Sequence, residues 1–265
     1  MAGMIPVQRH ERLLQLLRRD GVLSTRALTD ALDVSHMTVR RDIAALEADG
    51  LVEAVAGGVR LVGTGAGVQP PRGRAQRAEL ELDRKQAIAA IGAGMVEDGA
   101  TVYLDAGTTC QALVPLIARR EGVTVVTNDF FSVIALLDHP HVETVHIGGR
   151  VDTDSGSSCG VLATRMLEAF HLDVFFLSTG AWSVARGVTA PTADKLDLKR
   201  AVMERSRATV LLADATKYGA AATYRVAGLD DLDSIVVDDR LDLGARDQLA
   251  ALDVDVRLAA TVPPA

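Results

Sequence analysis

The sequence contains few cysteines, few aromatic residues and few lysines. Only two cysteines occur in 265 residues, Cys110 and Cys159, and no CxxC spacing brings them together. This pattern argues against a disulfide framework or a cysteine-rich zinc site, and it suits a reducing compartment. We expect both cysteines to be small buried core residues. Aromatic residues make up 3%, so the apolar content is mainly Val, Leu, Ile and Ala, which is typical of helix bundles and buried parallel strands.

Long apolar runs are also missing. No run approaches the roughly 20 residues that a membrane-spanning helix needs, and residues 1–21 lack the uninterrupted apolar stretch of a signal peptide. We therefore expect a cytoplasmic protein with no membrane association. The six histidines show no ligand spacing, which predicts neither a metal site nor a cofactor.

The net charge of −7 argues against attraction of nucleic acid to the whole surface, so any DNA contact must come from a local patch. Basic positions are mostly arginine, and only four of the 28 basic residues are lysines: Lys85, Lys195, Lys199 and Lys217. A lysine inside a motif is therefore more informative here than usual.

Composition divides the chain into two parts. Residues 1–62 contain three helical patterns and a short β-like stretch, and a Gly- and Pro-rich linker follows at 63–76. From residue 77 to 265 a helix, at roughly 77–97, leads into apolar runs that alternate with helical windows. The runs cover 101–104, 123–127, 144–147, 174–178, 209–213 and 234–237. Such alternation predicts an α/β domain with a mostly parallel sheet covered on both faces.

The stretch SHMTVRRDIAALEADG has the pattern of a DNA recognition helix. Ser35 is a good N-cap, Gly50 is a good C-terminal stop, and Val39, Ile43 and Leu46 form a buried seam at helical spacing. The opposite side presents small, polar and basic side chains that suit base edges and phosphates in a major groove. We expect DNA contacts from Ser35, His36, Met37, Thr38, Arg40 and Arg41. Residues 1–62 hold eight Arg against eight Asp and Glu, so a helical hairpin used for protein contact remains the alternative at this point.

The segment from Arg9 to Gly58 resembles the DNA-binding domain of the DeoR family of regulators, most closely in VSHMTVRRDIAALEADGLV. The resemblance implies a winged helix-turn-helix, DNA contacts by Ser35, Thr38, Arg40 and Arg41, and an Asp42 that orients an arginine. The wing departs from the family pattern, because Ala54 and Ala56 stand where an Arg and a His are usual before paired glycines. Arg60 is the cation that remains nearby.

Small, hydroxylated or charged residues follow five of the predicted strands. Ligands of open α/β sheets bind outside the carboxyl ends of the strands, and a Gly-Thr-Thr loop that enters a helix offers free amides, hydroxyls and a positive helix end to a phosphate. Asp105 can accept bonds from sugar hydroxyls, and Lys217 can supply a point charge. Each motif alone also fits a turn, an N-cap or a surface ion pair. Together they predict a ligand pocket at the carboxyl ends of the strands.

Residues 85–238 resemble the sensor domain of the same family, through DAGTT, VVTND, IGGR, the Ser157–Gly160 segment and LADATKYG. That domain is similar in fold to ribose-5-phosphate isomerase and the CoA transferases, and the resemblance implies binding of a sugar phosphate. The effector-binding residues expected on this basis are Asp105, Gly107, Thr108, Thr109, Thr127, Asn128, Gly149 and Lys217, to which the strand-end positions Arg150 and Gly180 are added. Lys195 stands where an acidic residue is usual, which implies a different choice of effector.

These observations predict a DNA-binding transcriptional regulator and not an enzyme. The expected function is repression of a carbohydrate operon, with double-stranded operator DNA and a phosphorylated sugar as partners and a homodimer or homotetramer as the assembly. One alternative is a sugar-phosphate isomerase or transferase with an accessory DNA-binding domain. Another is a DNA-binding protein whose α/β domain is only an assembly scaffold.

Overall fold

The computed structural model describes residues 9–10, 12–14, 16–17, 22–48, 51–55, 58–61 and 74–261. The chain divides into two compact units, residues 1–72 and 73–265. No helix among the described residues is long and apolar enough to cross a membrane.

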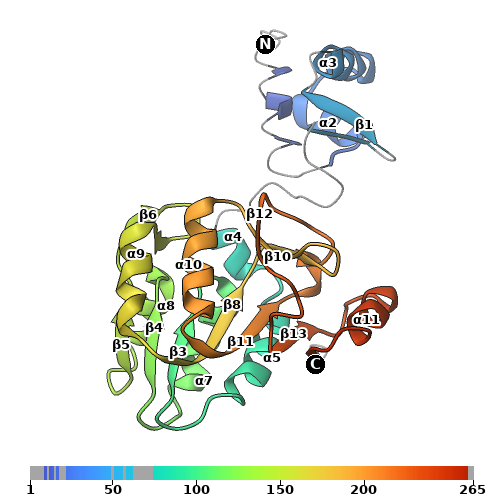
Figure 1. Cartoon of the computed structure of the whole chain (residues 1–265). Coiled ribbons are helices and arrows are strands. Elements are labelled where there is room, and N and C mark those ends of the chain that lie inside the picture. The colour runs from blue at the N-terminus through green and yellow to red at the C-terminus, as the bar shows by residue number, and fades with distance from the viewer. Residues whose placement is uncertain are drawn as a thin grey trace. The chain divides into compact units, whose positions relative to one another are not determined.

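The smaller unit is a winged helix-turn-helix (Figure 1). Residues 9–10, 12–14 and 16–17 are helical, and the named elements that follow are α2 (Thr25–Leu32), α3 (His36–Ala48), β1 (Val52–Val55) and β2 (Gly58–Leu61). Ser24 caps α2 by accepting a hydrogen bond from the Ala27 amide at 3.1 Å. The core consists of aliphatic side chains: Leu13, Leu16, Leu17, Leu28, Leu32, Val39, Leu46, Val52 and Val59.

The wing is the antiparallel pair β1–β2, to which Leu23 adds an isolated bridge at Val59. A Cβ atom at Gly58 would lie 2.4 Å from the Leu23 carbonyl oxygen, so only glycine allows this approach. The predicted stop at Gly50 and the wing residues Ala56 and Gly57 lie outside the described residues.

The larger unit is built on seven parallel strands in the order β14-β13-β11-β8-β3-β4-β5. Their bounds are β3 Thr101–Leu104, β4 Thr124–Thr127, β5 Glu143–His146, β8 Leu172–Ser178, β11 Ser206–Ala213, β13 Ser234–Asp238 and β14 Asp255–Ala259. All six apolar runs correspond to strands of this sheet, which confirms the α/β prediction. Because the strands are parallel, they all end at one side, here called the carboxyl edge.

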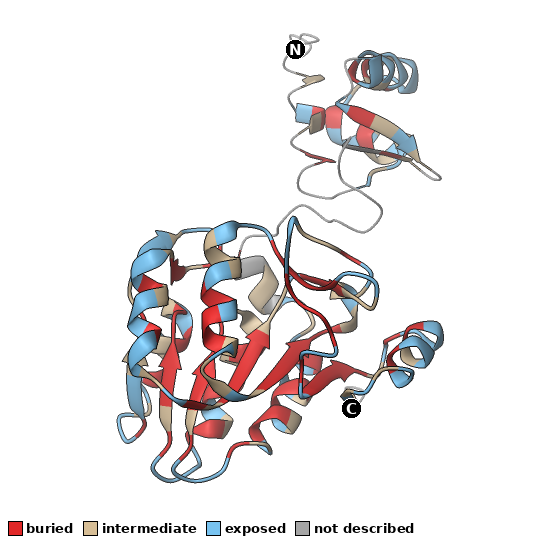
Figure 2. Cartoon of the chain, viewed as in Figure 1, coloured by how far each residue is buried: buried red, intermediate tan, exposed pale blue. Residues whose placement is uncertain are grey.

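Helices cover both faces of the sheet, and the strands between them are buried (Figure 2). One apolar layer packs beneath α5 (Leu82–Ala93), α7 (Val114–Ile117) and α8 (Phe130–Leu136). The other layer packs beneath α9 (Val161–Met166) and α10 (Ala193–Met203), which lie side by side in Figure 1. Both cysteines are buried, as predicted. The remaining helices are α6 (Thr108–Gln111), α11 (Leu243–Ala250) and the 3₁₀ turns η1 (Leu167–Ala169) and η2 (Ala215–Lys217).

Two small sheets that were not predicted flank the carboxyl edge. The hairpin β6 (Arg150–Asp152) and β7 (Ser157–Cys159) follows β5, and the second sheet has the order β12 (Tyr224–Ala227), β10 (Gly187–Ala190), β9 (Ala181–Ser183). Their strands of three or four residues are too short to show an alternating pattern.

The predicted helix at 77–97 and the end of the predicted linker need correction. Two helices occupy this stretch, α4 (Arg74–Glu79) and α5, and they are separated at Glu81, whose φ of 55° is left-handed. The linker was expected to extend to residue 76, but residues 74–76 form the start of α4. Arg74 fixes this start through a buried ion pair with Asp129, a tertiary contact that local composition does not reveal.

Candidate DNA-binding surface and effector site

The turn before α3 is held by its own side chains. Ser35 Oγ accepts a hydrogen bond from the Thr38 amide at 3.2 Å and lies 2.9 Å from Thr38 Oγ1. The two hydroxyls thus stabilise the first turn of α3, in agreement with the predicted N-cap.

The two faces of α3 differ as the helical pattern predicts. Val39 and Leu46 are buried, as predicted, but Ile43 is only half-buried. On the other side, Met37 is 60% exposed. His36, Arg40 and Arg41 are also exposed and Thr38 is half-buried. The exposed side therefore offers two guanidinium groups, an imidazole, hydroxyls and an apolar side chain to a ligand.

Asp42 lies on the buried side of α3 and accepts hydrogen bonds from Arg9 Nε at 2.6 Å and Arg9 Nη2 at 2.9 Å. His10 Nε2 lies 3.0 Å from Oδ1, the same oxygen that accepts from Arg9 Nη2. Burial raises the pKa of this carboxyl, but the hydrogen bonds from Arg9 and His10 outweigh it, so the pKa lies below its usual value. The prediction that Asp42 orients an arginine is confirmed, and the arginine is Arg9.

In the wing, the exposed Ala54 donates its amide to Glu47 Oε1 at 3.3 Å. The side chain of Arg60 lies outside the described residues.

At the carboxyl edge, the loops after β3 and β8 are joined by a buried ion pair. Lys199 of α10 reaches Asp105 Oδ2 and also donates to the Ser178 carbonyl at 2.7 Å. The second and third bonds to Asp105 come from the amides of Ser178 and Ala106, both at 2.9 Å. The carboxylate, predicted to meet sugar hydroxyls, is thus occupied by protein donors and fixes the position of Lys199.

The Gly107-Thr108-Thr109 loop passes close to β8. A Cβ atom at Gly107 would lie 2.1 Å from Ser178 Oγ and 2.8 Å from Ser178 Cβ, so glycine is required by this approach. Thr108 and Thr109 begin α6, which has only four residues. The first-turn amides still lack intrahelical partners, but the helix dipole is smaller than the sequence suggested.

The loop after β4 is tied to its neighbours by side chains. Thr127 Oγ1 donates to the Leu104 carbonyl at 2.6 Å, and Asn128 Nδ2 donates to the Ser158 carbonyl at 2.8 Å. Asn128 Oδ1 is buried and has no partner. This oxygen can therefore accept a hydrogen bond from a ligand hydroxyl or a water molecule.

The β6–β7 hairpin is attached to the start of α10 by two ion pairs. Arg150 pairs with Asp194, and Lys195 Nζ lies 2.5 Å from Asp152 Oδ2. Burial raises the pKa of Asp152, but the bond from Lys195 outweighs it and the pKa falls below its usual value. Arg150, predicted to bind effector, therefore points its exposed guanidinium to α10. At the preceding position, a Cβ atom on Gly149 would lie 2.6 Å from the Cys159 carbonyl oxygen, so only glycine fits there.

Positive charge collects around Asp214 after β11. Lys217 Nζ lies 3.9 Å from Asp214 Oδ2. The buried Lys85 donates to the carbonyl of Leu80 at 2.5 Å and to that of Arg77. Burial lowers the pKa of Lys85, and Lys217 and Arg77 lower it further while Asp214 opposes them. Gly180, at the end of β8, is exposed and has open space around it.

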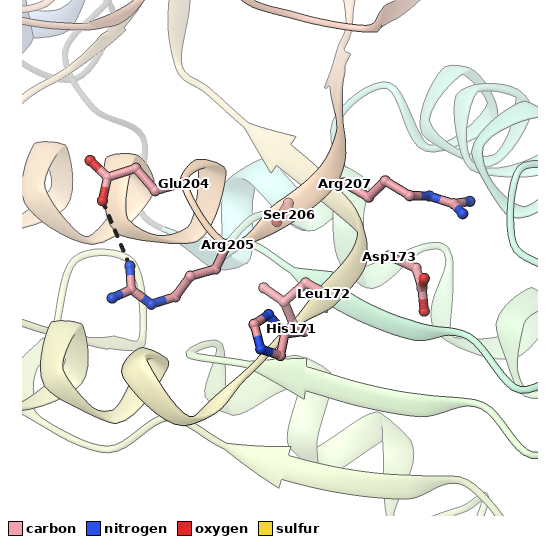
Figure 3. Close-up of a pocket in the computed structure, with 7 residues that line it drawn as sticks. All are labelled: His171, Leu172, Asp173, Glu204, Arg205, Ser206 and Arg207. Atoms are coloured by element: carbon pink, nitrogen blue, oxygen red, sulfur yellow. Dashed lines mark ion pairs between the residues drawn. The ribbon is translucent and has the colours of Figure 1, made fainter.

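A surface hollow of about 430 Å³ lies at the opposite edge of the sheet, where β8 and β11 begin (Figure 3). Its lining comprises His171, Leu172, Asp173, Glu204, Arg205, Ser206 and Arg207. We do not assign the effector to it, because it lies at the edge opposite the strand ends and no predicted residue lines it. Among the described residues no group of His, Cys, Asp and Glu could hold a metal ion.

Family models match both units of the chain. The DeoR-like helix-turn-helix domain matches residues 9–64, and the DeoR C terminal sensor domain matches residues 80–239. The chain belongs to the DeoR family.

Relatives that match almost the whole chain of this DeoR-family protein are named as transcriptional regulators. The uncharacterized HTH-type transcriptional regulator YgbI of Escherichia coli K12 is 40% identical over 97% of this chain and 99% of its own. GolR of Listeria innocua is 29% identical, over 90% and 92% of the two chains. A putative aga operon transcriptional repressor of Escherichia coli O157:H7 is 28% identical, over 95% and 93%. The protein is a DNA-binding transcriptional regulator.

Solved structures overlap less well. Ribose 5-phosphate isomerase A of Methanocaldococcus jannaschii has a TM-score of 0.38 and 14% identity, covering 51% of this chain and 53% of its own. The translation initiation factor eIF-2B of Pyrococcus horikoshii has a TM-score of 0.41 and 12% identity, covering 83% and 69%. Scores this low carry no information on activity.

Two residues at the carboxyl edge of this DeoR-family protein were not predicted from the sequence. Lys199 and Arg74 are both buried and both pair with a carboxylate of the strand ends. The scarcity of lysine was a usable signal for Lys199, because it is one of four. Nothing in the Gly- and Pro-rich surroundings distinguished Arg74.

Proposed function

We propose that this regulator is a repressor of a carbohydrate operon and that a phosphorylated sugar bound at the carboxyl edge controls its affinity for DNA. The observation that carries the proposal is the convergence of the loops after β3, β4, β5, β8 and β11 on one edge of a parallel sheet. Parallel α/β sheets bind ligands at this edge. The relative named as a repressor of the aga operon supports the sign of regulation.

The charges of the edge favour a phosphate. Lys217 pairs with the buried Asp214, and the charge of the buried Lys85 interacts with both of them. Two lysines near one carboxylate favour an anionic ligand although the chain is acidic. The amides and hydroxyls of Thr108 and Thr109 add hydrogen-bond donors. The unpartnered Asn128 Oδ1 supplies an acceptor for a sugar hydroxyl.

On the DNA side, the proposed contacts are those of the exposed face of α3, from Ser35 to Arg41. Arg40 and Arg41 are exposed there and suit guanine edges or phosphates of a major groove. Because helix-turn-helix proteins bind paired half-sites as dimers, we propose a homodimer or homotetramer.

A thermal-shift screen of pentose and hexose phosphates against the purified protein tests the effector. A specific sugar phosphate present at 100 times its Kd stabilises the folded state by about 2.7 kcal/mol, and Lys217→Ala is expected to weaken binding because a charge-assisted contact is lost. The alternative of an enzyme is tested in the same samples. Accumulation of an isomerised product beyond one equivalent, lost in Lys217→Ala, would replace the sensor by an isomerase. No shift with any sugar phosphate would refute the effector class.

A further inference from the structure

Arg74 is the first residue of α4 and is buried at the carboxyl edge. Its side chain is 6% exposed, and its Nη2 donates to Asp129 Oδ2 and to Gln111 Oε1, both at 2.9 Å. The guanidinium also lies over the ring of Phe131, 4.3 Å from its centroid. One side chain at the start of a six-residue helix therefore makes three kinds of contact with the body of the unit.

These contacts reach two of the five loops that form the proposed site, those after β3 and β4. Gln111 ends α6, whose first residues are Thr108 and Thr109, and Asp129 directly follows Asn128. Residues 62–73, which precede Arg74 in the chain, connect the two units. Arg74 thus joins the loops of the proposed site to the chain that leads to the DNA-binding unit.

The ion pair between Arg74 and Asp129 forms at a desolvation cost. Burial lowers the pKa of Arg74 and raises that of Asp129, so each charge is desolvated at a cost. The pair is not bidentate, because Asp129 Oδ1 is buried without a partner. Asp129 Oδ2 also caps α8 by accepting hydrogen bonds from the Ser132 amide at 3.3 Å and from Ser132 Oγ at 2.8 Å. The carboxylate therefore joins Arg74 to the start of the helix that follows β4.

We propose that Arg74 is a positioning residue that couples occupancy of the carboxyl edge to the docking of the start of α4. This inference rests on the proposed function. An anion bound by the Gly107–Thr109 loop is attracted by the docked guanidinium, so it favours the docked state. Linkage makes the effect reciprocal, because docking then strengthens anion binding by the same factor.

Limited trypsin digestion of the full-length protein measures docking directly, because cleavage after Arg74 requires this buried side chain to leave its site. Inorganic phosphate is the probe, with chloride at matched ionic strength as its control. In wild type, phosphate is expected to slow cleavage after Arg74 and to raise the melting temperature. In Asp129→Asn, cleavage after Arg74 should be about ten- to a hundredfold faster without phosphate, the effect of losing one charge-assisted hydrogen bond on an opening equilibrium.

The control variant is Asp173→Asn, the same substitution at the opposite edge, where Asp173 accepts the Thr101 amide at 2.9 Å. It should keep the wild-type cleavage and the phosphate protection. Gln111→Leu removes one bond to Arg74 without touching the carboxylate and should loosen docking to a smaller extent, which preserves the test if Asp129→Asn does not fold.

The outcomes separate the two proposals. Phosphate that raises the melting temperature of wild type but leaves cleavage after Arg74 unchanged overturns the coupling and leaves the effector site standing. If both Asp129→Asn and Gln111→Leu are cleaved after Arg74 at the wild-type rate, the coupling is likewise overturned and the effector site is left standing. Phosphate without effect on melting overturns the anion site and the coupling with it.

Discussion

Replacement of Lys199 by methionine tests the buried ion pair at the centre of the carboxyl edge. Methionine keeps the length of the side chain but removes its charge and leaves Asp105, which is 3% exposed, without its cation. Removing one partner of a buried pair costs about 3–5 kcal/mol. At about 2–4 °C per kcal/mol for a unit of this size, the melting temperature of the larger unit should fall by roughly 6–20 °C.

The double variant Lys199→Met/Asp105→Asn removes both charges and keeps an oxygen for the Ser178 amide. It should recover at least half of the lost stability, because no unpaired charge is left in the interior. Thermal melts followed by circular dichroism measure both variants. If the free energy of unfolding of Lys199→Met lies within about 1 kcal/mol of the wild-type value, the pair is not desolvated as described. If the double variant is no more stable than Lys199→Met, an unpaired buried charge is not the cause of the destabilisation.

Three further predictions concern other sites. Arg41→Ala should cost about 1–3 kcal/mol of specific DNA binding and relax specificity at one base pair; gel shifts at several salt concentrations on a duplex selected from a random library check this, and unchanged affinity would remove Arg41 from the interface. Thr108→Glu should abolish phosphate binding in calorimetry by repulsion and volume while operator binding persists, and wild-type affinity would place the phosphate elsewhere. The pKa of Asp42 is lowered on folding, so its contribution to the free energy of unfolding is fully present above about pH 5 and is lost as pH falls through the folded pKa. Asp42→Asn should therefore weaken the loss of stability of the smaller unit at acid pH, measured by denaturant titrations at several pH values. An unchanged pH dependence would contradict this.

The central sheet and the position of the site could be predicted because both follow from local patterns. Apolar runs of four or five residues predicted six of the seven strands, and parallel pairing then brings the residues after them to one edge. β14 was missed because Asp255–Ala259 mixes charged and apolar residues. It lies at the edge of the sheet, where most of its side chains are half-buried or exposed, so it has no continuous apolar run.

The contacts within the edge could not be predicted because they join distant positions. Lys199 and Asp105 are 94 residues apart, and Arg74 and Asp129 are 55 apart. Residue types alone made Asp105 look free to bind a ligand, whereas its oxygens are used by the protein. The break between α4 and α5 follows from similar contacts, since Lys85 takes the carbonyls of Arg77 and Leu80 where one continuous helix was expected.

The apolar clusters described above have a genetic consequence. One cluster draws its residues only from the first 72 positions, and the other two only from the larger unit. A missense change in one cluster therefore need not disturb the packing of the other unit. We expect alleles of the gene to fall into two groups: core changes before residue 73 abolish operator occupancy, and core changes after Arg74 abolish inducibility or assembly while the fold that reads DNA survives. In a cell that carries both copies, the first group should interfere with the wild-type protein, because an intact larger unit still enters the proposed homodimer or homotetramer. Members of the second group that cannot assemble should be masked by the wild-type protein.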